Sequence, residues 1–151
     1  MALANMTQKE TDRENREHCK SIAETLDKIV LGELYLCREC GEYTTIEIDE
    51  HITQPDVYRM DCCGHETEWE PEQVSLYDWL EGALDIEYRV GSDKEYRSAR
   101  FMVAFGGPTI YIDTASGMVE LYWWTDRASY PLRGEVVAEL DEIAAELWGC
   151  M

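Results

Sequence analysis

Basic residues and long apolar segments are both scarce in this sequence. Its 151 residues include 13 lysines and arginines against 32 aspartates and glutamates, which gives a formal net charge of −19. No apolar run approaches the ~18 residues that a membrane-spanning helix needs, and the first residues lack the basic and then apolar pattern of a secretory signal. We therefore expect a cytoplasmic protein with no membrane partner.

The sequence is also poor in residues that pair as nucleophile and base. Histidine occurs only at His18, His51 and His65, and no nucleophile elbow, His-Glu-x-x-His helix or phosphate-loop lysine is present. Carboxylates are so abundant that they single out no acid/base or magnesium site. We therefore expect that the protein is not an enzyme, and a hydrolase or nuclease with a second metal ion ranks last of three functions considered.

The negative charge is spread over the folded part of the chain. The net charge is −2 over residues 1–36, −8 over 37–70, −4 over 71–98 and −5 over 99–151. Such a field repels nucleic acid and anionic membranes and speeds encounter with basic partners. We therefore expect a protein partner with a basic surface and no direct binding of nucleic acid. The alternative is that the acidic residues only keep the protein soluble.

The most specific pattern is formed by four of the six cysteines. Cys37-Arg38-Glu39-Cys40-Gly41 is followed by Asp61-Cys62-Cys63-Gly64-His65. Two thiolates separated by two residues can bind one tetrahedral ion, because the tight turn between them directs both sulfurs inward. The pattern is typical of a zinc ribbon. It indicates a metal site rather than a disulfide framework in a reducing compartment.

We predict a structural Zn²⁺ bound by Cys37, Cys40, Cys62 and His65. Cys62 is preferred to Cys63, because two adjacent cysteines cannot easily both bind one ion with ideal geometry. Cys63 remains the alternative, and His51 is a weaker candidate for the fourth position. Since all four ligands come from the protein, the predicted site has no open position for catalysis.

Hydrophobic periodicity predicts an α+β fold in three parts: an N-terminal helix (1–36), a zinc-ribbon hairpin (37–70) and an α+β domain (71–151). The helix is expected to begin with a capping box at Thr11 and Glu14 and to end at Gly32. A second capping box, Ser75 with Asp78, predicts a short helix.

Alternating residues predict the strands. Residues 44–48 and 57–60 are expected to form hairpin strands joined by a polar stretch. Residues 86–125 are expected to form an antiparallel sheet of about four strands, and an apolar stripe over 136–147 predicts a C-terminal helix packed across it.

Four residues are candidates for partner binding: Trp123, Trp124, Glu139 and Glu142. Consecutive strand residues face opposite sides, so Trp123 and Trp124 cannot both enter the same core. We expect one indole beneath the last helix, with the other either covered by the N-terminal helix or exposed as an anchor. Glu139 and Glu142 belong to the acidic face of the last helix.

Three segments of the sequence occur together with the upstream Cys-x-x-Cys-Gly and Ser75-Leu76-Tyr77-Asp78: Ala104-Phe105-Gly106-Gly107-Pro108-Thr109-Ile110-Tyr111-Ile112-Asp113, Val119-Glu120-Leu121-Tyr122-Trp123-Trp124 and Ala128-Ser129-Tyr130-Pro131-Leu132. With these segments the chain resembles small acidic zinc-ribbon proteins of phages and mobile elements of gut bacteria. The resemblance brings no catalytic residues. Some small acidic proteins of mobile elements are anti-CRISPR inhibitors, so the resemblance implies inhibition by analogy.

The function expected from the sequence is that of an acidic protein-binding inhibitor from a mobile element. It would block a basic nucleic-acid-binding groove of a host defence protein such as a CRISPR effector nuclease, because carboxylates on a rigid fold can stand in for phosphates. The alternative is a zinc-ribbon regulatory or assembly adaptor that docks on transcription or replication machinery through Trp123 or Trp124.

Overall fold

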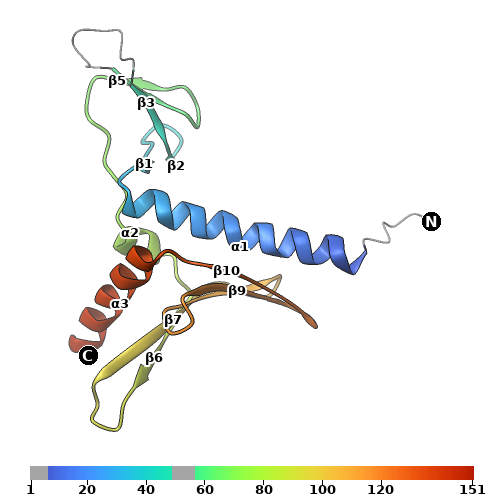
Figure 1. Cartoon of the computed structure of the whole chain (residues 1–151). Helices are drawn as coiled ribbons and strands as arrows, with labels where there is room; N and C mark the ends of the chain where they lie inside the picture. Colours follow the sequence, from blue (N-terminus) through green and yellow to red (C-terminus); the bar gives the residue numbers. More distant parts are fainter. Residues whose placement is uncertain (1–6, 49–56) are drawn as a thin grey trace.

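The computed structural model describes residues 7–48 and 57–151 and has an α+β fold (Figure 1). A long helix, α1 (Gln8–Val30), leads into a small ribbon of short strands, and an antiparallel sheet and the helix α3 (Gly134–Gly149) follow. The ribbon lies beyond the C-terminal end of α1, on the opposite side of that helix from the sheet (Figure 1). Within the described ranges, no helix has the length and apolar character needed to span a bilayer.

Helix α1 begins earlier than the sequence predicted. Its N-cap is Thr7, whose side chain accepts a hydrogen bond from the Glu10 amide, while the Glu10 carboxylate accepts one from the Thr7 amide at 3.0 Å. The predicted pair, Thr11 and Glu14, has the same spacing but lies inside the helix. The earlier start is favoured because each residue added to an existing helix gains a backbone hydrogen bond.

The end of α1 at Gly32 is confirmed. The Gly32 amide donates to the Ile29 carbonyl at 3.0 Å, and the Glu33 amide donates to the Lys28 carbonyl at 2.8 Å. This pair of bonds is the Schellman arrangement, which needs a residue with positive φ, and Gly32 has a φ of +73°. The turn sends the chain from the helix into the ribbon.

The C-terminal sheet has five strands in the order β10-β9-β8-β7-β6, and each strand is antiparallel to its neighbours. The sequence predicted about four strands and missed β10. The half-buried apolar side chains of β10 are Ala128 and Tyr130. Pro131 fits this strand because β10 lies at the edge of the sheet. The strands are β6 (Asp85–Val90), β7 (Tyr96–Ala104), β8 (Thr109–Asp113), β9 (Met118–Trp123) and β10 (Asp126–Pro131).

The main core lies between one face of this sheet and the helices. Phe101, Ile112 and Val119 are directly opposite one another on neighbouring strands and therefore share a face. Helix α1 packs on β9 and β10, and α3 packs on β7, as the sequence predicted for the last helix. The buried residues of this core come from α1 (Cys19, Ala23, Leu26, Ile29), the sheet (Ala99, Phe101, Ile110, Ile112, Val119, Leu121), α3 (Val136, Leu140, Ala144) and residues 34 and 74–80 (Leu34, Val74, Leu76, Leu80).

Within its described residues, the ribbon contains two small antiparallel sheets. One pairs β1 (Tyr35–Leu36) with β2 (Tyr43–Thr44), and the other has the order β3 (Ile46–Ile48), β4 (Tyr58–Met60), β5 (Glu66–Thr67). The predicted hairpin strands are thus present, although residues 43–48 form two strands rather than one. The predicted polar link, which contains His51, lies outside the described residues.

The chain segment that leaves the ribbon is hydrogen-bonded to the segment that enters it. The Leu36 amide donates to the Glu72 carbonyl, and the Val74 amide donates to the Leu34 carbonyl, both at 2.9 Å. Helix α2 (Leu76–Leu80) then begins at the predicted capping box of Ser75 and Asp78, which is confirmed. These bonds attach the ribbon to the core through two chain segments instead of one.

The expectation that one of the two adjacent tryptophans lies beneath the last helix is wrong. Trp123 is the last residue of β9, and its side chain lies over Gly107, where a Cβ would be 2.9 Å from Trp123 Cζ3. Trp124 lies in the turn before β10 and is 90% exposed. Both indoles stand at the end of the sheet, whereas α3 packs on β7.

Replacing Gly32 with alanine should lower the free energy of unfolding by about 1–2 kcal/mol, because its φ is positive and an added Cβ would be 3.2 Å from Gln73 Nε2. Gly149→Ala is the matched control, because a Cβ there meets no atom within 4 Å. Urea unfolding followed by circular dichroism measures both. A Gly32→Ala protein as stable as the Gly149→Ala protein would contradict the conformation described for this turn.

Candidate metal centre

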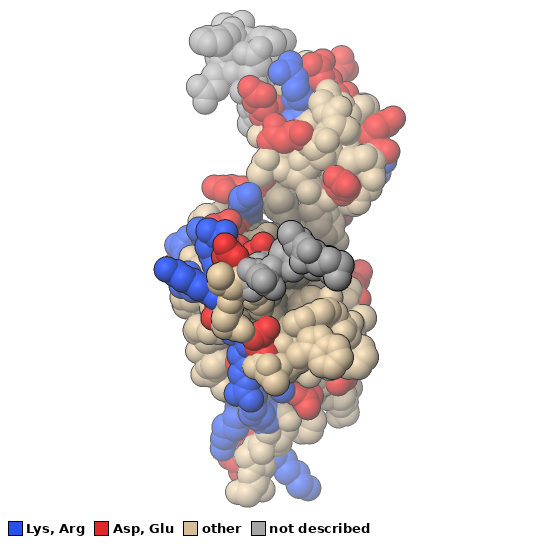
Figure 2. Space-filling view, turned by 90° about the vertical axis from the view of Figure 1, so that its right-hand side faces the viewer, with Lys and Arg blue, Asp and Glu red and all other residues tan. Residues whose placement is uncertain are grey.

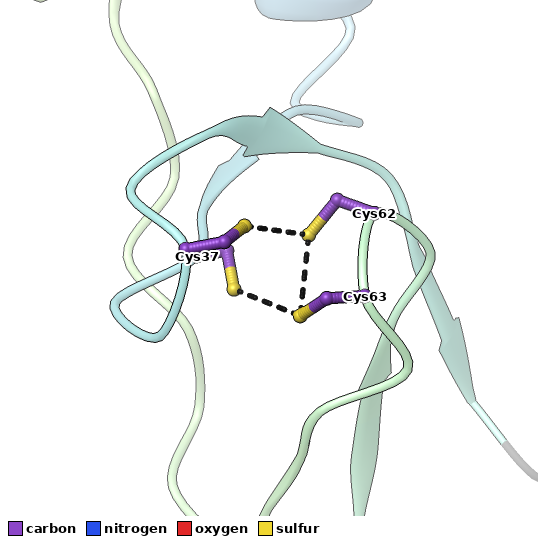
Figure 3. Close-up of side chains that lie close together, drawn as sticks. Cys37, Cys62 and Cys63 are labelled. Carbon is purple, nitrogen blue, oxygen red and sulfur yellow. Dashed lines mark hydrogen bonds between the residues drawn. The ribbon is translucent and has the colours of Figure 1, made fainter.

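Four cysteine thiols converge within the ribbon. The Sγ atoms of Cys37, Cys40, Cys62 and Cys63 all lie within 4.8 Å of one another, and this group can hold a metal ion. Figure 3 shows Cys37 on one turn facing Cys62 and Cys63 on the other. The Sγ–Sγ distances are 3.7 Å for Cys37–Cys63, 3.3 Å for Cys40–Cys62 and 3.7 Å for Cys62–Cys63. A tetrahedral ion with metal–sulfur distances of about 2.3 Å places its ligands about 3.8 Å apart, so these thiols need little rearrangement to bind it.

The two turns that carry the thiols have the same backbone hydrogen bonds. In the first, the Gly41 amide donates to the Cys37 carbonyl at 2.7 Å and the Cys37 amide donates to the Glu42 carbonyl at 2.8 Å. In the second, the Gly64 amide donates to the Met60 carbonyl at 2.8 Å and the Met60 amide to the His65 carbonyl at 2.9 Å. Gly41 and Gly64 have φ values of +77° and +72°, which residues with a Cβ atom rarely adopt. The sequence therefore forms two equivalent knuckles.

The equivalence of the knuckles explains the adjacent cysteines. Cys63 precedes Gly64 as Cys40 precedes Gly41, so Cys63 occupies the second ligand position of its knuckle. The first position, equivalent to Cys37, is occupied by the buried Met60. Because Met60 carries no thiol, the fourth thiol of the group comes from Cys62, one residue before Cys63.

The predicted ligand set differs from this group at one position. Cys37, Cys40 and Cys62 belong to it, but its fourth member is Cys63, and His65 is not a member. His65 instead lines a cleft beside Met60 and Thr67. Two adjacent cysteines can both face the centre because the second knuckle bends sharply at Gly64, a geometry that spacing alone did not reveal.

Two threonines between the knuckles hold the second one in place. The buried Thr44 accepts a hydrogen bond from the Cys62 amide at 2.9 Å through its Oγ1 atom. The Asp61 amide donates to the Thr45 carbonyl at 3.1 Å, and the Thr45 hydroxyl also donates to the Asp61 carboxylate. Because Thr44 belongs to the strand that pairs with β1, these bonds connect the two halves of the site.

The close packing shifts the pKa values of two thiols in opposite directions. The backbone N–H of Cys40 donates to the sulfur of Cys37 and lowers the pKa of Cys37 to about 7. Loss of hydration, together with hydrogen bonds that the Cys62 thiol donates to neighbouring sulfurs, raises the pKa of Cys62 to about 12. A metal ion binds thiolates, so binding must release the proton of Cys62 and is favoured as the pH rises.

The candidate partner-binding residues lie on other elements. Trp123 and Trp124 are at the turn between β9 and β10, while Glu139 is half-buried and Glu142 exposed on α3. A further feature was missed by the sequence reasoning: Trp69, next to the ribbon, is 83% exposed and lines the same cleft as His65. The sequence did hold a sign of this exposure: Trp69 stands between Glu68 and Glu70, outside any periodic apolar pattern that would place it in the core.

Substitution of Cys63 by serine should weaken metal binding by more than about a hundredfold, because a hydroxyl is a poor replacement for a thiolate ligand. His65→Ala should retain the metal. Metal content after gel filtration with a competing chelator, and the thiolate-to-cobalt absorption of the Co²⁺-loaded proteins, measure both. Loss of metal in the His65→Ala protein with retention in Cys63→Ser would restore the ligand set predicted from sequence and contradict the one described here.

Comparison of the chain with protein-family models, with curated proteins and with solved structures finds no match. The geometry and chemistry of the site itself therefore provide the basis for its interpretation. The group consists of four thiols from two equivalent knuckles, and it is one that can hold a metal ion.

Proposed function

We propose that the protein is a non-catalytic inhibitor whose zinc-stabilised acidic ribbon occupies a basic surface of a partner protein. The proposal that zinc stabilises the ribbon rests on the convergence of four thiols at tetrahedral spacing. Soft thiolate ligands in a tetrahedral set favour Zn²⁺ over hard cations such as Mg²⁺. With four protein ligands the ion has no open position for water or substrate, so its role is structural.

The ribbon needs such an ion because it contains little apolar material of its own. Between residues 35 and 67, the buried hydrophobic residues in the described part of the chain are Cys37 and Met60. Burying one large apolar side chain contributes about 1.5–3 kcal/mol, which does not offset the entropy of ordering a segment of this length. Metal binding supplies the remaining free energy of folding.

The surface of the ribbon is strongly acidic. Its described residues contain Arg38 and Arg59 as the sole lysine or arginine residues, and both are ion-paired: Arg38 with Glu72 at 3.4 Å and Arg59 with Glu66 at 3.0 Å. In Figure 2 the charged side chains on the ribbon at the top are mostly acidic, while many lysine and arginine side chains lie on the body below it. Because its charge is mostly negative, the ribbon attracts a basic surface more strongly than the body does.

Helix α3 adds a second acidic surface. Its residues Glu139, Glu142 and Glu146 make no ion pair with any described residue, and its last turn contains no basic residue. Fixed carboxylates of this kind can replace the phosphates of a nucleic acid in a basic groove. The resemblance to mobile-element proteins suggests a nucleic-acid-binding groove of a host defence protein, such as a CRISPR effector nuclease, as the surface that is blocked.

The zinc-loaded protein should capture its partner from a nuclease-treated bacterial lysate at about 0.05 M salt and lose affinity for it at least tenfold at about 0.5 M salt. The double variants Glu39→Gln/Glu42→Gln on the ribbon and Glu139→Gln/Glu142→Gln on α3 should also weaken binding about tenfold. Glu14→Gln/Glu17→Gln on α1, which removes the same charge, is the matched control. The captured partner should lose nucleic-acid binding when saturated. Affinity that is independent of salt and of the ribbon and α3 double variants, or that the α1 control weakens equally, would contradict the proposal.

One observation favours a second function, that of an adaptor that docks through an aromatic anchor. Trp124 is 90% exposed and has a φ of +53°, a conformation that is strained for a residue with a large side chain. It occupies a two-residue turn between Trp123 and Asp126, which pair across β9 and β10. Glycine is the residue favoured in such a position, so stability alone does not explain a tryptophan there.

For the adaptor function, Trp124→Gly should raise the free energy of unfolding by about 1 kcal/mol, because it relieves the strained φ, and should weaken partner binding more than about tenfold. Trp124→Phe, which keeps an aromatic ring, is the control. Thermal unfolding and binding of the partner at the two salt concentrations measure both effects. Unchanged partner binding by the stabilised Trp124→Gly protein would exclude the adaptor function.

A further inference from the structure

A cleft of about 600 Å³ lies between the second knuckle and the segment that leads from the ribbon to the core. This volume is in the range of sites that bind small molecules or single side chains of a partner. The cleft is separate from the four thiols, although the second knuckle contributes to its wall. Its walls include Leu36, Met60, Trp69, Pro71 and Glu72.

Backbone and side-chain hydrogen bonds hold the two walls in place. The Leu36 amide donates to the Glu72 carbonyl at 2.9 Å, which fixes the outgoing segment against β1. The Trp69 amide donates to the Thr67 hydroxyl at 3.2 Å at the end of β5. Met60, which is buried at the start of the second knuckle, also lines the cleft. The shape of the cleft thus depends on the folded ribbon.

The lining of the cleft combines three chemical features. Leu36, Met60 and Pro71 provide apolar surface, Trp69 provides an aromatic face that is 83% exposed, and Glu70 and Glu72 provide carboxylates. A long cationic side chain needs all three: an apolar wall for its methylene groups, a ring for its charged end and a carboxylate for its hydrogen bonds.

The protein already places one cation in this cleft. Arg38 contacts Glu72 at 3.4 Å, with side-chain exposures of 83% and 61%. An ion pair this exposed contributes little to stability and is easily exchanged. The cation of a partner can therefore replace that of Arg38 at Glu72 with little loss of folding energy.

We propose that this cleft binds one arginine or lysine side chain of a basic segment of the partner protein, with Trp69 against the cation and Glu72 as its hydrogen-bond acceptor. The inference rests on the proposed function, which requires a basic partner, and it names the contact. Charge complementarity supports this occupant over an anionic one. The described ribbon carries Arg38 and Arg59, each ion-paired with a carboxylate, among many more acidic residues.

The test is a titration of the full-length, zinc-loaded, ¹⁵N-labelled protein with the peptide acetyl-Gly-Arg-Gly-amide, followed by NMR. Chemical-shift changes should be concentrated on the Trp69 indole N–H and on the backbone amides of the cleft. The same peptide with citrulline, the neutral isostere of arginine, should cause no such changes. Shifts produced equally by the citrulline peptide, or shifts produced at the cleft by inorganic phosphate instead, would overturn the proposal.

Two variants, each with a matched control, sharpen the test. Trp69→Ala should weaken peptide binding about threefold to tenfold, whereas Trp124→Ala, which removes a similarly exposed indole elsewhere, should not.

Arg38→Ala should strengthen binding about threefold, because it removes the internal competitor for Glu72. Arg97→Ala, which removes the same charge from an exposed pair with Asp93, should change it far less. Metal content shows that each variant retains its folded ribbon. Weaker peptide binding by Arg38→Ala would contradict the proposal.

Failure of this inference can be distinguished from failure of the proposed function. If Trp69→Ala and Glu72→Gln leave the salt-sensitive capture of the partner unchanged, the cleft is not the contact and the acidic-ribbon function stands. If the peptide binds the cleft but no captured partner responds to salt or to the Glu39→Gln/Glu42→Gln change, the cleft stands and the proposed function fails.

Discussion

The convergence of four sulfur atoms from two knuckles is the constraint on which the ribbon depends. The knuckles are far apart in sequence, and the buried hydrophobic residues in the described part of residues 35–67 are Cys37 and Met60. Thr44 and Thr45 accept hydrogen bonds from the second knuckle and so align it with the first, but both threonines lie in a segment too short to fold independently. An ion bound by the four thiols would join the two knuckles with a strength that so small a core cannot provide.

The attachment of the ribbon to the rest of the molecule transmits this constraint. The ribbon follows the Schellman turn of α1 and returns to the core beside its own first strand, where Leu34 and Leu36 are hydrogen-bonded to Val74 and Glu72. Because two segments rather than one connect the parts, the acidic surface is held in a defined position relative to the sheet. This matters for recognition, since fixed charges lose less entropy on binding than mobile ones.

Acidic residues serve different purposes in different parts of the molecule. Asp113 is buried and forms a bidentate ion pair with Arg89, at 2.7 Å and 2.8 Å, and this pairing lowers the pKa of Asp113. Asp141 accepts a hydrogen bond from the hydroxyl of Tyr96 at 2.6 Å and so joins α3 to β7. Glu139, Glu142 and Glu146 of α3, by contrast, make no ion pair with any described residue. A net charge summed over the whole chain does not separate these groups.

Local patterns in the sequence determined much of the fold. The apolar stripe of α1, the stop at Gly32, the capping box of Ser75 and Asp78, the C-terminal helix and four strands of the sheet depend on neighbours a few residues apart, and all were predicted from sequence. The start of α1 was misplaced because two capping pairs with the same spacing occur in one segment. The strand β10 was missed because an edge strand needs less apolar alternation than a central one.

Only the tertiary structure decided the composition of the thiol group, the position of the tryptophans and the cleft. Spacing identified three of the four cysteines that could hold a metal ion, but the choice between Cys63 and His65 depended on how the second knuckle bends at Gly64. The exposure of Trp69 and Trp124 depends on which elements cover them. Sequence spacing records distances along the chain, whereas ligation and exposure depend on distances between segments that only folding brings together.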